Sequence, residues 1–182
     1  MTWLKRALAA FGLAALLAGG FWGWVVSVNL PNLTPSTSVS VVDRSGVLLR
    51  AYPVADGRWR LPATADQVDP LYRAMLMAYE DKRFETHHGV DPRALARGVW
   101  QLISNGRVVS GGSTLTMQVA RLLEDGATGE WSGKLRQIRL ALALERQLTK
   151  DEIFTLYLNL APMGGNIEGL RAATRAYFGK DP

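Results

Sequence analysis

Two adjacent acids, Glu80 and Asp81, are the strongest candidates for chemistry in this sequence, and they open the segment "EDKRFETHHGVDP". On a helix, Glu80 shares a face with apolar residues one turn away, among them Phe84. Burying a carboxylate on an apolar stripe is costly, but an acid held partly out of water is suited to act as a general base. The alternative is a surface ion pair with Arg73 or Arg83, which is common for a single acid.

A glycine pair precedes a second polar cluster, in "SGGSTLTMQVAR", residues 110–121. Ser113 and Thr114 fall at the start of a predicted helix, and Gln118 and Arg121 follow on its second turn. The free N–H groups and positive end of a helix suit a phosphate or another anion, and glycine permits close approach. A plain N-cap by Ser113 after a glycine-rich loop explains the same pattern, so both interpretations stay open.

Basic residues open a third helical stretch, "GKLRQIRLALALERQL", in which Lys134, Arg136 and Arg139 lead into an apolar run. Cations at the N-terminal end of a helix oppose its macrodipole, and an anionic ligand there would offset that cost. The alternative is a charged edge exposed to solvent. Metal and thiol chemistry have little support, because the adjacent His87 and His88 point apart and the sequence has no cysteine. A role in shaping their loop is favoured for the histidines.

Local start and stop signals predict the helices that carry these residues. An Asp-Pro pair or a capping box marks three helix starts, at Asp69, Asp91 and Thr149. Three more helices are expected: one after "GGST", one after a loop that contains Gly126, Gly129 and Gly133, and a last one around Ala172. Ahead of them, "VSVVDRSGVLLRAY" has two β-forming runs around a turn, the pattern of a hairpin. The sequence therefore predicts a mainly α domain with a small N-terminal β element.

The N-terminal region is predicted to be a membrane anchor. Residues 7–28 contain no charge, and a helix of that length, rising about 1.5 Å per residue, crosses a hydrocarbon core of about 30 Å. Two basic residues precede this run and no charge follows before Asp43, so the positive-inside rule places residues 1–6 in the cytoplasm. Trp22 and Trp24 suit an interfacial belt. A cleaved signal peptide is the alternative, but the run is long for one and no small-x-small cleavage site follows it.

The remainder of the chain divides into a linker and a folded domain. Residues 29–38 are rich in Pro, Asn, Ser and Thr and are expected to be a linker, and residues 39–182 form the domain. The excess of basic over acidic residues is +5 for the chain and +3 once Lys5 and Arg6 are set aside. So mild an excess argues against nucleic acid as a partner and fits anionic headgroups or a phosphorylated lipid.

Five segments, in their order and spacing, resemble the motifs of the peptidoglycan glycosyltransferase family, the transglycosylase domain of class A penicillin-binding proteins and of monofunctional transglycosylases. The segments are "EDKRFETHHGVDP", "GGSTLTMQ", "GKLRQIRLALALE", "TKDEIFTLYLN" and "GGNIEGLRAATRAYFGK". The resemblance runs from about Val39 to Pro182. Within the family, "DGRWRLP" and Met117 are most similar to the penicillin-binding protein 1C branch.

The resemblance implies a lysozyme-like fold with an apolar jaw that dips into the membrane, for which residues 90–109 are the candidate. It also implies that Glu80 is the catalytic general base. The residues that match substrate-binding positions of the family are Asp81, Phe84, Ser113, Thr114, Gln118, Arg121, Lys134, Tyr157 and Asn159. A diphosphate leaving group would explain both predicted anion sites, at Ser113 and at Lys134.

By the same resemblance, the reaction joins the disaccharide-pentapeptide units of lipid II into glycan strands and releases undecaprenyl diphosphate, with inversion at the anomeric carbon. The implied partners are lipid II, the growing glycan strand, inner-membrane lipid and cell-wall synthesis proteins, and not nucleic acid. No cofactor is required, and a divalent metal is optional. The expected location is the bacterial inner membrane, with one span and the catalytic domain on the periplasmic side, as the N-terminal part of a bifunctional penicillin-binding protein.

One departure from the family pattern bears on the mechanism. Many members carry a second glutamate where this chain has Gln137, and a neutral amide cannot take a proton, so Glu80 must act alone. Two rival functions remain, a lytic enzyme of the same broad fold that uses its acid as a proton donor, and a catalytically silent lipid-binding module. The basic cluster argues against lysis, which releases no diphosphate. Retention of Glu80, "GGST" and Lys134 argues against the silent module.

Overall fold

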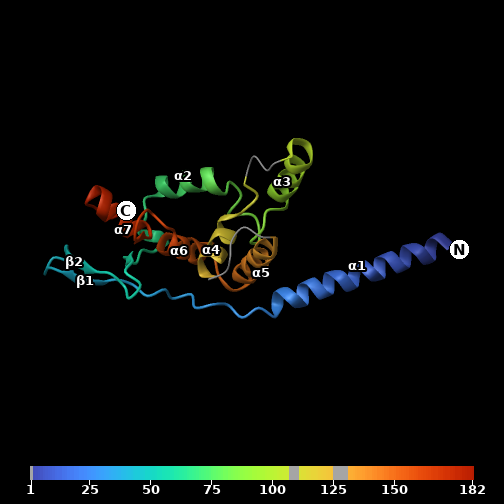
Figure 1. Cartoon of the computed structure of the whole chain (residues 1–182), viewed down its shortest axis with the longest axis horizontal. Helices are drawn as coiled ribbons and strands as arrows, with labels where there is room; N and C mark the ends of the chain where they lie inside the picture. The colour runs from blue at the N-terminus through green and yellow to red at the C-terminus, as the bar shows by residue number, and fades with distance from the viewer. Residues whose placement is uncertain (1, 107–110, 125–130) are drawn as a thin grey trace.

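The computed structural model describes residues 2–106, 111–124 and 131–182 as a mainly helical domain with one long helix projecting from it (Figure 1). Its elements are α1 (Thr2–Val26), β1 (Val39–Val42), β2 (Leu48–Tyr52), β3 (Trp59–Arg60), the 3-10 helix η1 (Ala65–Gln67), α2 (Pro70–Glu80), α3 (Pro92–Asn105), α4 (Leu115–Leu123), α5 (Trp131–Gln147), α6 (Lys150–Leu160), β4 (Ile167–Glu168) and α7 (Leu170–Phe178). The predicted mainly α fold with a small β element and an apolar N-terminal helix is confirmed. Two parts of the predictions, jaw residues 107–109 and the loop glycines Gly126 and Gly129, lie outside the described residues.

The predicted helix starts are confirmed where the cap is local. Asp69 accepts a hydrogen bond from the Leu71 N–H at 2.8 Å, and Asp91 caps α3 in the same way. Thr149 and Glu152 form a reciprocal capping box at the start of α6. Each cap satisfies N–H groups that a helix end otherwise leaves without partners, so these acids and the hydroxyl set where each helix begins.

Two helix starts differ from the prediction. Thr114, and not Ser113, caps α4, because its Oγ1 accepts from the Met117 N–H at 3.1 Å. Helix α5 begins at Trp131, so Gly133 lies inside the helix and not in the preceding loop. The propensity cost of a helical glycine is only about 1 kcal/mol, which tertiary packing readily outweighs, and Gly133 is buried.

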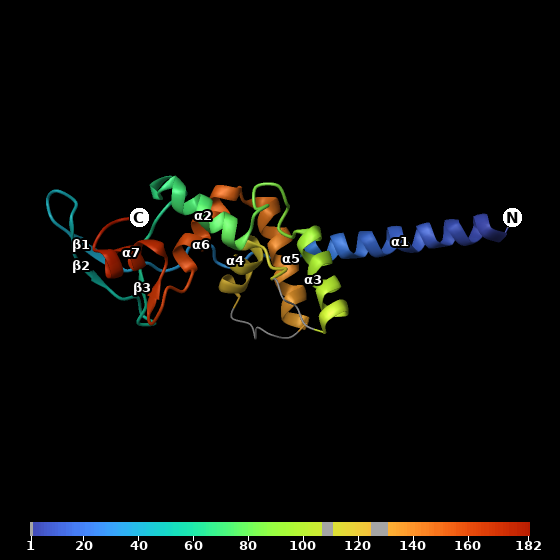
Figure 2. The same ribbon diagram turned by 90° about the horizontal axis from the view of Figure 1, so that it is seen from above.

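Helix α4 is the centre of the core, packed between α5 and α6 (Figures 1 and 2). Its apolar residues recur at helical spacing on the faces that meet those two helices. Most of the largest fully buried apolar side chains come from these three helices: Leu115, Met117, Val119, Leu140, Leu144, Ile153, Phe154 and Leu158. The elements that carry the predicted polar residues are therefore fixed against one core.

The β structure lies at the end of the domain away from α1, beside α7 (Figure 2). Strands β1 and β2 form the predicted antiparallel hairpin, with Val39 opposite Tyr52. A second pair, β3 and β4, is parallel and was not predicted. The buried Arg60 guanidinium joins its two strands by donating from Nε to Glu168 Oε2 at 2.9 Å. A strand of two residues has no periodicity to recognise, which explains why the sequence pattern missed it.

Helix α1 is long and apolar enough to cross a membrane by length and composition, and its side chains are almost all exposed. The helix begins at Thr2 and ends at Val26, whereas the predicted span covers residues 7–28. Its C-terminal end rests on α5, and α3 stands at the same end of the domain in both views (Figures 1 and 2). Helix α3 exposes Val99, Trp100, Leu102 and Ile103.

Candidate active site

Glu80 is the last residue of α2 and is half-buried. Its Oε2 accepts a hydrogen bond from Gln118 Nε2, on the second turn of α4, at 2.8 Å. The surface-pair alternative is not what the structure contains, because Arg73 and Arg83 each form ion pairs with other acids. The Glu80 carboxylate is therefore oriented by a neutral amide, which leaves its negative charge available for chemistry.

Tyr157, on α6, shares the surroundings of Glu80. Burial, followed by the negative charge of Glu80 and then by Tyr72, raises the pKa of Tyr157 to about 12, and the charge of Arg121 partly opposes this rise. The phenol therefore keeps its proton at neutral pH and remains a hydrogen-bond donor next to the carboxylate. Tyr72 is a member of this group that the sequence patterns did not single out.

Lys134, in the first turn of α5, donates a hydrogen bond from Nζ to Ser113 Oγ. Burial lowers the pKa of Lys134, and the neighbouring positive charge of Arg121 lowers it further. Two like charges held close together, one of them partly buried, are unfavourable until an anion comes between them. The arrangement of Lys134, Arg121 and the Ser113 hydroxyl is therefore that of a site for a strongly charged anion.

Two hydrogen bonds and three electrostatic interactions link six of the predicted residues into one group, which we call the candidate active site. Glu80 interacts with Gln118 and Tyr157, Tyr157 with Arg121, Arg121 with Lys134, and Lys134 with Ser113. A proton acceptor thus lies at one end of the group and an anion site at the other. This polarity is what a reaction needs when it deprotonates one oxygen and expels another as an anion.

Four other residues from the predicted set lie inside the fold, and none is more than 9% exposed: Asp81, Phe84, Thr114 and Asn159. The Thr114 hydroxyl donates to the Gly89 carbonyl at 2.6 Å while it caps α4. The Asn159 amide exchanges hydrogen bonds with the backbone of Ala63, at 2.9 and 2.8 Å. The structure therefore commits these side chains to the fold. The Ser113 hydroxyl belongs to the anion site, whereas the Thr114 hydroxyl is used by the backbone.

The two arginines of the basic cluster, Arg136 and Arg139, have partners outside the anion site. Arg139 donates from Nε to the Trp24 carbonyl at 2.7 Å and from Nη2 to Ser27 Oγ at 3.0 Å. Its guanidinium also lies 4.8 Å from the centroid of the Trp24 ring. Arg136 pairs with Glu124, with 3.8 Å between Arg136 Nε and Glu124 Oε2. The cluster that the sequence presented as one feature is thus divided between an anion site and a contact with the N-terminal helix.

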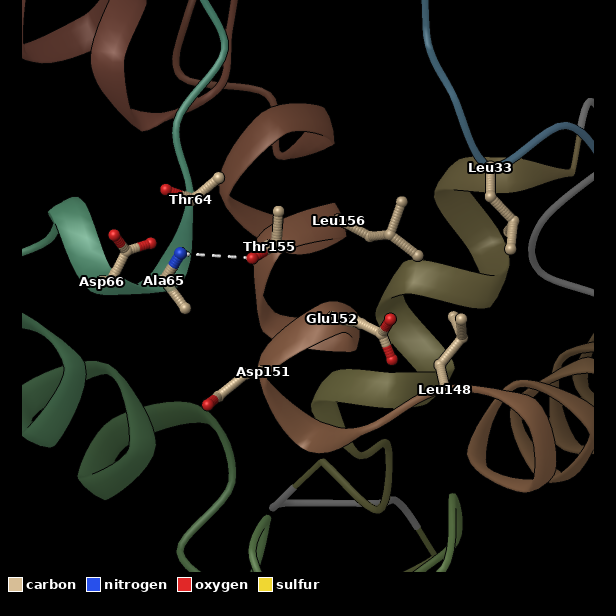
Figure 3. Close-up of a pocket in the computed structure, with 9 residues that line it drawn as sticks. All are labelled: Leu33, Thr64, Ala65, Asp66, Leu148, Asp151, Glu152, Thr155 and Leu156. Carbon is tan, nitrogen blue, oxygen red and sulfur yellow. Dashed lines mark hydrogen bonds between the residues drawn. The ribbon is translucent and has the colours of Figure 1, made fainter.

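A cavity of about 410 Å³ lies apart from this group, between the linker, η1 and the first half of α6 (Figure 3). Leucines and three acids line much of it, but the carboxylates of Asp66, Asp151 and Glu152 point in different directions (Figure 3). They do not converge on a cation. Within the described ranges, no three His, Cys, Asp or Glu side chains are placed to hold a metal ion.

Comparison with known proteins shows the family of this chain. The family model named Transglycosylase matches residues 45–182. Penicillin-binding protein 1C of Escherichia coli K12 is 47% identical over 180 residues, which are 99% of this chain and 23% of that protein. Penicillin-binding protein 1A of Pseudomonas aeruginosa is 45% identical, over 64% of this chain and 14% of its own length. Penicillin-binding protein 1F of Bacillus subtilis is 34% identical over 98% of this chain and 24% of its own. The chain thus spans about a quarter or less of the length of these relatives.

Proposed function

Because the chain belongs to the Transglycosylase family, we propose that it polymerises lipid II into peptidoglycan glycan strands, with Glu80 as the general base. The observation that carries this proposal is the polarity of the candidate active site. A carboxylate oriented by Gln118 lies at one end, and Lys134 with Arg121 lies at the other. Proton removal and departure of an anion are the two events of this transfer, and each has its own end of the site.

In the proposed step, the Glu80 carboxylate takes the proton from a sugar hydroxyl of the acceptor. The oxygen then attacks the anomeric carbon of the lipid-linked donor, the bond from that carbon to the diphosphate oxygen breaks, and the configuration inverts. Undecaprenyl diphosphate leaves with the bonding electron pair. Its developing charge is met by Lys134, Arg121 and the Ser113 hydroxyl. Tyr157, whose pKa is raised to about 12, stays protonated and does not compete for the proton.

This assignment gives every proton transfer to Glu80, because the neutral Gln137 stands one turn after Lys134 on α5. The proposed step uses no cofactor. A divalent cation at the diphosphate stays an option, since it would add positive charge at the end that already carries Lys134 and Arg121. That option is tested by adding a chelator to the polymerisation assay.

The proposed setting is the outer face of the bacterial inner membrane, where lipid II and the growing strand are held. Helix α1 would be the single span, with its N-terminus in the cytoplasm. The exposed apolar side of α3 stands at the end of the domain where α1 leaves, which is where a jaw would meet the bilayer (Figure 2). Because the relatives are at least four times longer than this chain, we also propose that it is the glycosyltransferase part of a bifunctional penicillin-binding protein.

Two assays with the full chain in detergent micelles test the proposal. Labelled lipid II should be converted into glycan polymer with release of undecaprenyl diphosphate, and preformed glycan strands should remain intact. Cleavage of the strands without polymerisation would establish the lytic function instead. Binding of lipid II without either reaction would establish the silent lipid-binding module.

A further inference from the structure

A second group of charged side chains lies buried beneath the candidate active site, and its centre is Asp81. Asp81 ends α2 directly after Glu80, and its side chain is only 4% exposed. Its Oδ2 accepts two hydrogen bonds, one from the Leu115 N–H at 2.8 Å and one from His87 Nε2 at 2.7 Å. The Leu115 N–H opens α4. Asp81 therefore joins the end of one site-bearing helix to the start of another, and His87 holds it there.

The far side of His87 is fixed by residues of α4, α5 and α6. The Lys150 ammonium donates to the His87 carbonyl and to Glu145 Oε1, each at 2.7 Å. The Thr116 hydroxyl donates to the same Glu145 oxygen at 2.7 Å. The imidazole itself has its Nδ1 facing Glu145 Oε1 at 4.0 Å, and Nδ1 forms no hydrogen bond. His87 is thus enclosed by the charged groups of Asp81, Glu145 and Lys150.

This geometry leads to an inference about Glu80 that rests on its proposed role as the base. We propose that His87 is a positioning residue that acts through Asp81 to set the distance between Glu80 and the anion site. Glu80 precedes Asp81 in the chain, whereas Gln118 and Ser113 flank the α4 N-terminus that Asp81 binds. A shift of the Asp81 carboxylate moves both ends of the candidate active site relative to one another.

The hydrogen bonds around Asp81 and His87 serve mainly to orient the two helices, and they contribute little to stability. A buried ionic group adds little stability over well-packed apolar residues of the same volume, because desolvation offsets the attraction between the charges. What apolar residues cannot supply is direction. The two hydrogen bonds to Asp81 Oδ2 fix where the α2 terminus lies relative to α4. A misplacement of about 1 Å in a catalytic group costs on the order of 10²-fold in rate.

Three variants of the full chain in detergent micelles test the inference. His87→Leu keeps the buried volume apolar but removes the bond to Asp81, and we expect kcat for lipid II polymerisation to fall by about 10²-fold, with KM changed little. In His87→Gln the amide nitrogen occupies the place of Nε2 and donates to Asp81, so kcat should recover to within a few-fold of the parent. His88→Leu is the matched control at the exposed neighbouring histidine, and it should behave as the parent.

The outcomes separate this inference from the function on which it rests. A His87→Leu variant that remains folded with parental kcat would overturn the positioning role, as would a glutamine variant no better than the leucine variant. If His87→Leu melts below the assay temperature, Asp81→Asn takes its place, because it keeps the side-chain shape and removes the charge that binds both donors. Glu80→Gln is assayed alongside. Parental polymerisation by that variant would refute the proposed base itself, whatever the result at His87.

Discussion

At the scale of single residues, Glu80 and Lys134 divide the proposed reaction between them. Glu80 is held by a neutral amide and keeps its charge for the proton, while Lys134 is held by a hydroxyl and keeps its charge for the leaving group. An electrostatic contact that strengthens as charge develops in the transition state is typically worth about 3 to 4 kcal/mol. Lys134 is therefore expected to matter nearly as much as the base.

Replacement of Lys134 tests that assignment. Lys134→Ala removes the charge and should lower kcat/KM for lipid II by about 10²- to 10³-fold, whereas Lys134→Arg restores a cation and should lose much less. The measurement is the initial rate of polymer formation at several lipid II concentrations. Equal rates for the alanine variant and the parent would remove Lys134 from the anion site.

The pH dependence of the same variants gives a separate test. Burial and the charge of Arg121 lower the pKa of Lys134, so its ammonium loses a proton at a lower pH than an ordinary lysine does. Polymerisation by the parent should therefore decline on the alkaline side as this charge is lost. An arginine at this position stays charged to a higher pH, so the alkaline decline of Lys134→Arg should move upward. Coincident alkaline limbs in parent and variant would contradict the assignment.

The sequence identified residues of the candidate site more readily than it identified their surroundings. Glu80, Gln118 and Lys134 stand out by type and local position. By contrast, nothing near Asp81, Thr114 or Asn159 in the sequence indicates the long-range hydrogen bonds that hold these side chains within the fold. Their partners are Leu115, Gly89 and Ala63, which are separated from them by 34, 25 and 96 positions. Such long-range bonds depend on the packing of helices, which local patterns do not encode.

At the scale of secondary-structure elements, local chemistry again decides what is predictable. The helices that begin at Asp69, Asp91 and Thr149 carry their own caps, and the structure has them as predicted. The pairing of β3 with β4 depends on a bond between Arg60 and Glu168, which are 108 positions apart, so no local sequence pattern predicts this pairing. Elements stabilised by neighbouring residues in the sequence could be predicted, whereas elements stabilised by residues far away in the sequence could not.

Gly89 links the loop after α2 to α5 and makes an element-scale prediction. Its φ is +87°, and a Cβ there would lie 2.6 Å from the Ala141 carbonyl oxygen. Gly89→Ala must therefore strain the backbone and push the loop off α5, with an expected loss of at least about 2 kcal/mol of unfolding free energy. Thermal unfolding measures this loss. Gly98→Ala is the control, since a Cβ added at Gly98 would meet no atom within 4 Å and the variant should not lose stability.

At the scale of the whole molecule, the contact between α1 and α5 connects the proposed anchor to the helix that carries Lys134. Arg139 binds the Trp24 carbonyl and lies over its ring, and Arg146 lies 5.3 Å from the centroid of the Trp22 ring. The sequence indicated an interfacial belt for the tryptophans and an anionic ligand for Arg139. The structure brings these residues together, so the height of the site above a membrane would be set by this contact.

Loss of the Arg139 contact should loosen α1 from the domain. Spin labels at the exposed Leu17 on α1 and Gln147 on α5 should give a narrow distance distribution in the parent and a broad one in Arg139→Ala, because the variant loses both hydrogen bonds and the ring contact. Arg50→Ala, which removes a similar ring contact at Tyr52 in the hairpin, is the control and should leave the distribution narrow. An unchanged distribution in Arg139→Ala would show that this contact does not hold the helix.

The central claim, that this is a glycan polymerase whose base is Glu80, is tested most directly by Glu80→Gln. Glutamine keeps the size of the side chain and an oxygen that accepts from Gln118, but it cannot take the proton of the acceptor hydroxyl. Polymer formation from lipid II should fall by at least ~10²-fold, while the melting temperature and lipid II binding stay close to those of the parent. Polymerisation by the variant at a near-parental rate would contradict the account.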